Sequence, residues 1–309
     1  MWSFPATSAV PTICWRWWRG SVEPIGRSRH MPEPLNGYDV HTIRPASRRS
    51  PLVDVHGHFG RSAATGYSAG APELLAAMDH HGIDTTLVMP QPSTDRETAD
   101  EVHAEIGEAV ARHPGRLYGI VNLDPRLPDA EYRRRAATLL DRPGFVAVKI
   151  HTAGFAVAPD DPVCDKAFRI AADYDVPVMV HTGLGGPHTL PHRVVDPARR
   201  YAERPVVLCH AGFGAFCAEA IEVAVTQSNV HLEPSWCPAF SVRQMVRRLG
   251  AHRVMFGSDH IDNIPVELAK FDAVGLTPGE RRLVYAGTAA SVFSLDPSAP
   301  ATPRPEVSA

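Results

Sequence analysis

The chain has 309 residues, of which 44% are apolar, enough to bury the core of one large domain or two smaller ones. Its 31 Lys and Arg residues nearly balance its 34 Asp and Glu residues, and no run of like charges or long apolar segment indicates a nucleic-acid or membrane partner. The five cysteines are scattered without CxxC spacing, which argues against a disulfide framework or structural zinc cluster and favours the reducing cytoplasm. We therefore expect a cytoplasmic protein with a small-molecule partner.

The two ends of the chain differ in composition from the rest. Residues 1–50 are rich in Pro, Arg and Ser and show neither a strand nor a helix period, which predicts a largely irregular N-terminal leader. Residues 296–309 contain PSAPATPRP and are predicted to form a disordered Pro-rich tail. We expect the intervening residues 51–295 to form one domain.

Eight short apolar runs follow one another through this domain. They are LVDVH at 52–56, TTLVMP at 85–90, LYGIVNL at 117–123, FVAVKI at 145–150, PVMVH at 177–181, VVLCH at 206–210, VHLE at 230–233 and RVMFGSD at 253–259. Their starts are 23 to 33 residues apart, close to the ~30 residues of one strand-helix unit. Because most are apolar on both faces, they suit parallel strands that helices cover.

The segments between the runs have helical patterns. Pro72 begins PELLAAMDHHG, whose apolar stripe ends at Gly82, and apolar residues recur at i+4 spacing over 102–110. Thr277 opens a capping box before the last apolar stripe. Eight such units predict a single-domain (β/α)8 TIM barrel. A doubly wound open sheet would show the same alternation, but no GxGxxG follows the first run.

Histidines cluster where these runs end. In a barrel, functional groups lie at the C-terminal ends of the strands and on the loops that follow. Six candidates occupy such positions: His56, His58, His151, His181, His210 and Asp259. Strict alternation along the first strand would put His56 and His58 on one side with Asp54 below them, and Val53 and Val55 against the helices. By the same rule Cys209 would face the helices.

This set predicts a metal centre. A lone histidine at a strand end is more often a hydrogen-bonded rim residue, but several that end strands of one barrel favour a shared ion. His56, His58, His181 and Asp259 would bind one divalent ion, zinc or else manganese, and leave a position open for water. Metal-bound hydroxide would then attack a carbonyl of an ester, lactone or amide while Asp259 takes the proton.

Several motifs together resemble the amidohydrolase superfamily, in its amidohydrolase-related branch of metal-dependent TIM-barrel hydrolases and decarboxylases. They are DVHGH at 54–58, GFVAVKIHTAGFAVAPDD at 144–161, PVMVHTG at 177–183, VVLCHAG at 206–212 and VMFGSDH at 254–260. The resemblance runs from about Pro51 to Leu295. It implies His56, His58 and His181 as metal ligands, Asp259 as a ligand that shuttles the proton, and His210 as the catalytic neighbour that polarises substrate or orients water. Homodimers are common among similar enzymes.

Three function hypotheses remain open at this point. The first is a hydrolase of a small, carboxylate-bearing substrate. The alternative is a lyase, since similar members decarboxylate aromatic or muconate-like acids with the same ligands. The third is a barrel that binds a small molecule without catalysis, against which the complete ligand set argues. TatD-like nucleases also open with HxH, but they carry a glutamate ligand mid-barrel, where this chain has VKIHT.

Further candidates surround the predicted mouth. Four side chains are predicted to contact substrate: Lys149, His151, Arg61 and His188. In some superfamily members a lysine on the fourth strand is carboxylated and bridges two metals. We expect instead that Lys149 is unmodified, either with an acidic partner or holding a substrate carboxylate, and hence that the site binds one ion. Trp236 follows the seventh run and would line the pocket or pack in the core.

Overall fold

A computed structural model describes residues 50–62, 66–93 and 95–295. Contacts divide the chain into a unit Met1–Ser47 and a unit Arg48–Ala309, and every described residue belongs to the second. The predicted leader, apart from residue 50, and the predicted Pro-rich tail lie outside the described residues.

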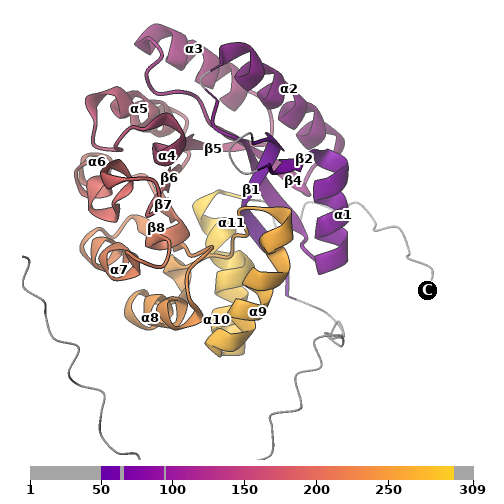
Figure 1. The fold of residues 1–309 in the computed structure, drawn as a ribbon, viewed down its shortest axis with the longest axis vertical. Coiled ribbons are helices and arrows are strands. Elements are labelled where there is room, and N and C mark those ends of the chain that lie inside the picture. The colour runs from indigo at the N-terminus through magenta and orange to yellow at the C-terminus, as the bar shows by residue number, and fades with distance from the viewer. Residues whose placement is uncertain (1–49, 63–65, 94, 296–309) are drawn as a thin grey trace, which may run out of the picture. The chain divides into compact units, whose positions relative to one another are not determined.

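Apart from one short strand, the strands follow one another in chain order in a single sheet, which helices surround (Figure 1). Seven of them run parallel, and each coincides with one of the first seven predicted apolar runs. They are β1 (Val53–Arg61), β3 (Thr85–Pro90), β4 (Leu117–Val121), β5 (Phe145–Ile150), β6 (Val178–His181), β7 (Val206–Cys209) and β8 (Val230–Glu233). The short β2 (Ser68–Ala69), which the sequence did not predict, pairs antiparallel with the end of β1.

The eighth predicted run, residues 253–259, is irregular but closes the barrel. It is joined to β8 by a bridge between Leu232 and Val254, and to β1 by a bridge between Gly57 and Asp259. Asp259 has φ 70°, which an extended strand does not accommodate, so the run bends at its last residue. The predicted TIM barrel is therefore confirmed, but its eighth strand position is occupied by an irregular segment that pairs with its neighbours through isolated β-bridges.

The helices are α1 (Ala71–His81), α2 (Arg96–Arg112), α3 (Asp129–Leu140), α4 (Thr152–Phe155), α5 (Asp165–Asp173), α6 (Val195–Arg200), α7 (Cys217–Thr226), α8 (Ala239–Leu249), α9 (Ile264–Val274), α10 (Pro278–Arg282) and α11 (Thr288–Val292). Most of them cover the outside of the sheet, whereas Ala289 and Val292 of α11 belong to the apolar cluster inside the barrel. The predicted end of α1 at Gly82 and the capping box of Thr277 with Glu280 are both present. Among the described helices, none is long and apolar enough to cross a membrane.

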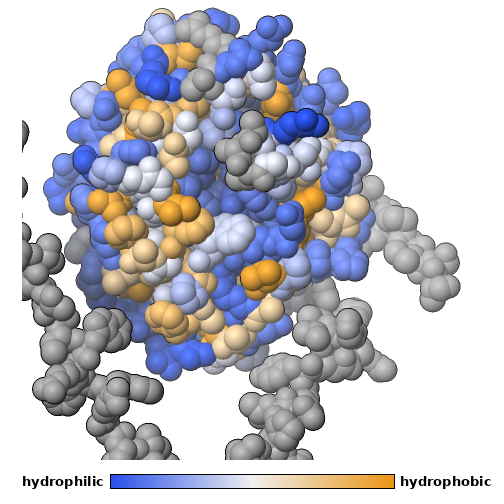
Figure 2. Space-filling view, in the orientation of Figure 1, coloured by the Kyte–Doolittle hydropathy of each residue, from blue (hydrophilic) through white to orange (hydrophobic). Residues whose placement is uncertain are grey.

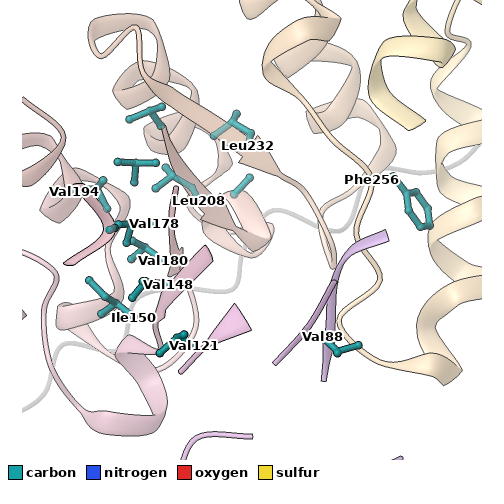
Figure 3. Packing of buried hydrophobic residues seen from close by; sticks show 14 of the residues in the cluster. Val88, Val121, Val148, Ile150, Val178, Val180, Val194, Leu208, Leu232 and Phe256 are labelled. Carbon is teal, nitrogen blue, oxygen red and sulfur yellow. The ribbon is translucent and has the colours of Figure 1, made fainter. Parts of the chain in front are cut away.

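Two apolar clusters lie on opposite faces of the sheet. The outer cluster joins strand residues such as Val178 and Val180 to the helices (Figure 3). The inner cluster contains Met179 from the other face of β6, together with Val53, Val55 and Cys209. The expected outward direction of these last three residues was therefore wrong.

Two local departures from strand geometry explain the error. The pairing of β1 with β3 shifts register between Asp54 and Gly57, so alternation does not continue from Val55 to His56. After Cys209 the chain turns at once, because His210 has φ 62° and begins a 3-10 turn. At neither place can the direction of the preceding side chains be inferred from that of the histidines by simple alternation.

Phe256 packs at the closing side of the barrel and provides a test of its stability. Its ring is fully buried, with centroids 5.4 Å from Phe271 and 5.8 Å from Tyr285. We expect Phe256→Ala to lower the free energy of unfolding in urea by about 3–5 kcal/mol, because it leaves a cavity. Phe240→Ala is the control, since that ring is 65% exposed. Equal stability of the two variants would contradict this packing role.

Candidate metal centre

The histidines that end the strands converge, as predicted, although they span more than 150 residues of sequence. The ring centroid of His56 lies 5.3 Å from that of His58 and 4.9 Å from that of His210. The ring of His181 lies 4.8 Å from His210 and 4.7 Å from His151, with which it stacks. Because the strands are parallel, their C-terminal ends meet at one end of the barrel and bring these rings together.

Asp259 completes the cluster from the closing segment. Its Oδ1 lies 3.3 Å from His58 Nε2 and 3.5 Å from His56 Nε2, and the indole N–H of Trp236 donates to Oδ2 at 2.8 Å. Burial opposes ionisation of Asp259, but the surrounding histidines favour the carboxylate, His58 among them through a hydrogen bond, and the pKa of Asp259 lies well below the usual range. Asp259 is therefore a carboxylate at neutral pH.

Three of the buried histidines, His56, His181 and His210, are neutral. Burial, together with the positive charge of Lys149, lowers the pKa of His56 well below its usual value and that of His181 to about 4. Burial also lowers the pKa of His210 well below its usual value. Each ring therefore has one nitrogen lone pair available at neutral pH, the form in which histidine binds metals.

These residues fit a metal ion. The Nε2 of His181 lies 2.8 Å from the carbonyl oxygen of Leu184, to which it donates, which leaves its Nδ1 buried with no hydrogen-bond partner among the described residues. The Nδ1 of His58 is buried and unpartnered in the same sense. Ligand atoms of His56, His210 and Asp259 lie within 4.8 Å of one another. Buried, bare imidazole nitrogens beside one carboxylate are the donor set of a zinc site.

The structure places the predicted ligands beside one further residue. His56, His58 and Asp259 are in direct contact, and His181 adjoins them through His210. His210 was assigned to substrate or water, yet it lies as close to His56 and Asp259 as a ligand would. The ligand roles of these residues stay predictions.

Lys149 has different partners from those expected. It is fully buried, with its Nζ 3.0 Å from Cys209 Sγ and 3.3 Å from His56 Nε2. Among the described residues no carboxylate lies within ion-pair distance of this ammonium, so the acidic partner considered from the sequence is not there. His56, Cys209 and Glu233 form a second group of side chains whose ligand atoms lie close enough to hold a metal ion. The Lys149 ammonium contacts two of these side chains, His56 and Cys209.

The other candidates for substrate contact are dispersed. His151 lies within the cluster, with its ring centroid 5.9 Å from that of His58. His188 lies in a 3-10 turn (Pro187–Thr189), and its buried Nε2 has no hydrogen-bond partner among the described residues. Arg61 is exposed at the end of β1, where it pairs with Ser68 of β2. Substrate contact by these residues stays a prediction.

Asp54 joins the first strand of the barrel to the segment that closes it, beneath the site. Its buried carboxylate accepts hydrogen bonds from the backbone N–H and hydroxyl of Ser258 and from the backbone N–H of His56. Burial raises the pKa of Asp54 to about 7. Between the two histidines, a Cβ at Gly57 would lie 2.9 Å from Thr86 Cγ2, so only glycine fits without displacement of β3. The DVHGH motif therefore supplies a carboxylate that binds the closing segment, two imidazole rings, and a glycine that lets β1 pack closely against β3.

Three residues of the site have left-handed backbone. His210, Trp236 and Asp259 have φ of 62°, 64° and 70°. Such conformations cost non-glycine residues on the order of 1 kcal/mol or more and persist where the surrounding structure fixes them. The turn that each residue makes aims its side chain at the mouth of the barrel instead of along a strand.

The bond from Trp236 to Asp259 gives a testable prediction. Hydrogen bonds to charged groups are worth about 1.5–3 kcal/mol, so Trp236→Phe should lower kcat by about 10–100-fold. Phenylalanine keeps a ring for the stack with Phe213, whose centroid is 6.0 Å away, so the change isolates the indole N–H. Steady-state kinetics and the melting temperature are measured together. A variant with wild-type kcat would contradict an orienting role for the indole.

Comparisons with known proteins identify a family and a fold. A sequence model of the amidohydrolase family matches residues 53–295. No curated protein matches the chain. Among solved structures, 5-carboxyvanillate decarboxylase from Sphingomonas paucimobilis has a TM-score of 0.63 at 14% identity, over 80% of this chain and 100% of that one.

Two further structures show the range of reactions on this fold. The enzyme of the same name from Novosphingobium aromaticivorans, complexed with manganese and a nitrobenzoic acid, has a TM-score of 0.62 at 15% identity, over 79% and 96% of the chains. A probable 2-pyrone-4,6-dicarboxylic acid hydrolase from Acinetobacter baumannii has a TM-score of 0.59 at 17% identity, over 79% and 99%. At these identities the likeness shows the fold.

Proposed function

This chain belongs to the amidohydrolase family, and on that premise we propose that it is a metal-dependent hydrolase acting on a carbonyl of a small ester, lactone or amide. One observation carries the proposal: an ionised carboxylate, Asp259, contacts two buried histidines, His56 and His58, at the mouth of the barrel. A base beside nitrogen donors with free lone pairs is the arrangement that hydrolysis requires.

The residues divide the work as follows. A single divalent ion, zinc in this proposal, held by His56, His58, His181 and Asp259 would supply Lewis-acid chemistry to the carbonyl and to water. Asp259 accepts the proton that water loses, and Oδ1 is the receiving atom because Trp236 already donates to Oδ2. His210, whose Nδ1 lies 2.8 Å from Ser235 Oγ, has Nε2 left to accept a hydrogen bond from that water and orient it.

Decarboxylation is the second candidate, favoured by the apolar surroundings of the site. Phe213 and Trp236 stack at 16° beside Asp259, and Trp236 is 41% exposed. Leu184, in the loop after β6, and Phe240, near the start of α8, are also exposed. On the face that Figure 2 shows, apolar residues form several patches separated by hydrophilic residues. A planar aromatic acid suits such a wall. The bond to its carboxyl carbon would break, carbon dioxide would leave, and a proton would replace it on the ring.

The remaining parts of the proposal concern the surroundings of the reaction. We place contacts to a carboxylate-bearing substrate at Lys149, His151, Arg61 and His188. We also propose a cytoplasmic location and, by analogy with similar enzymes, a homodimer.

One experiment separates the candidates. The purified protein is analysed for metal, then incubated in ¹⁸O-water with small esters, lactones, amides and aromatic acids. One equivalent of metal and ¹⁸O in the product support hydrolysis, whereas carbon dioxide release without ¹⁸O uptake supports the second candidate. Protein that contains no metal, and whose melting temperature Zn²⁺ or Mn²⁺ does not shift, would overturn both in favour of a binding protein.

A further inference from the structure

A buried glutamate, Glu233, links two of the site histidines. We propose that Glu233, the last residue of β8, is a positioning residue that holds both His56 and His210 as Nδ1–H tautomers, so that the lone pair of each ring is on Nε2. The role of those two nitrogens in binding metal rests on the proposed function. The hydrogen-bond network itself does not.

The first branch of the network is direct. Glu233 Oε2 lies 2.7 Å from His56 Nδ1, and both side chains are fully buried. A carboxylate can only accept, so the hydrogen of this bond is on His56 Nδ1. In a neutral ring the lone pair is then on Nε2, the atom that lies 3.3 Å from Lys149 Nζ, which can donate to it, and 3.5 Å from Asp259 Oδ1. A carboxylate behind an imidazole fixes its tautomer and makes it a stronger ligand.

The second branch passes through one hydroxyl. Ser235 Oγ lies 3.1 Å from Glu233 Oε2 and 2.8 Å from His210 Nδ1. The hydroxyl has one hydrogen, and the carboxylate must receive it, so Ser235 accepts from the other side. The bond from His210 therefore comes from Nδ1–H, which leaves the lone pair of His210 on Nε2.

The carboxylate is itself fixed in place. The backbone N–H of Ser235 donates to Oε1 at 2.6 Å and that of His210 to Oε2 at 3.3 Å. On the neighbouring segment, a Cβ at Gly257 would lie 2.6 Å from Glu233 Cδ, so the glycine leaves room for the carboxylate. Among the described residues no lysine or arginine lies within ion-pair distance of Glu233. The contacts of its carboxylate are hydrogen bonds, including the one from His56, as expected of a residue that orients imidazole rings.

The test uses metal-free protein with ¹⁵N-labelled histidine. Long-range ¹H–¹⁵N spectra are expected to show Nδ1–H tautomers for His56 and His210. In Glu233→Gln the amide group replaces one acceptor oxygen with a donor, so at least one of the two rings should change to Nε2–H. In Ser235→Ala only His210 should change. A purely structural tie between strands would lower the melting temperature and leave these tautomers as they are.

Zn²⁺ affinity, measured by chelator competition, gives the second readout. Loss of such a partner costs about 10–100-fold in metal affinity, which is the weakening expected for Glu233→Gln. Glu219→Gln is the matched control, because Glu219 pairs with the exposed His192 outside the site. Nε2–H tautomers in the wild type, or unchanged tautomers in Glu233→Gln, would overturn the proposal. Nδ1–H tautomers in a wild type that binds no Zn²⁺ would uphold the positioning and sink the proposed function instead.

Discussion

Asp259→Asn should turn over substrate about 10²–10⁴-fold more slowly than the wild type, the usual contribution of a positioned acid or base. The amide keeps the shape of the carboxylate and can still accept a hydrogen bond from Trp236. It cannot take a proton from water, and it removes the negative charge that faces His56 and His58. The loss should therefore fall on kcat with little change in folding.

A nearby aspartate provides the control for this substitution. Asp262 is three residues further along the chain and exposed, so Asp262→Asn should keep wild-type kcat. Both variants are compared by steady-state kinetics on a substrate found in the ¹⁸O screen, and by melting temperature. If Asp259→Asn turned over as fast as Asp262→Asn, Asp259 would not be the base.

His58→Ala should abolish stoichiometric metal binding and, with it, activity. The ring is buried, its Nδ1 has no hydrogen-bond partner among the described residues, and its Nε2 contacts Asp259. Alanine removes the ligand outright. Since loss of an outer hydrogen-bond partner alone weakens metal binding by about 10–100-fold, we expect more than about 100-fold here. Metal analysis and chelator competition with Zn²⁺ measure the effect.

His192→Ala is the histidine control for this prediction. His192 is exposed and pairs with Glu219 on the surface, so its removal should leave one equivalent of metal bound. Retention of a full equivalent of tightly bound Zn²⁺ by the His58→Ala protein would exclude His58 from the ligand set.

Much of this site could be predicted from local sequence, for a physical reason. Parallel strands buried on both faces must be apolar, so a polar residue that ends such a run is conspicuous, and the barrel brings those ends together. That reasoning found His56, His181, His210 and Asp259 without any knowledge of their distances. The same rule applies to Glu233, the charged residue that ends the seventh run, although Glu233 was not among the predicted site residues.

The rest depends on contacts that local sequence does not specify. The register shift in β1 reverses the side-chain alternation that placed Val55 against the helices. The contact of Lys149 with Cys209 joins residues 60 positions apart, and the bond of Trp236 to Asp259 needs left-handed backbone at both residues. Each of these features depends on how segments that are distant in sequence pack against each other. The periodicity of a single segment does not predict that packing.

The closing side of the barrel also determines when the site can form during folding. Asp259 exchanges backbone hydrogen bonds with His56 and His58, and Asp54 bonds Ser258 across 204 residues of sequence. At about 5–20 residues per second of synthesis, β1 waits ten seconds or more for this partner. Meanwhile most of one edge of β1, apart from Gly60 and Arg61, which pair with β2, stays open to association with other chains. Contacts of such sequence separation form slowly, so Asp259 can join His56 and His58 only after the closing segment has been synthesised and has returned to the first strand.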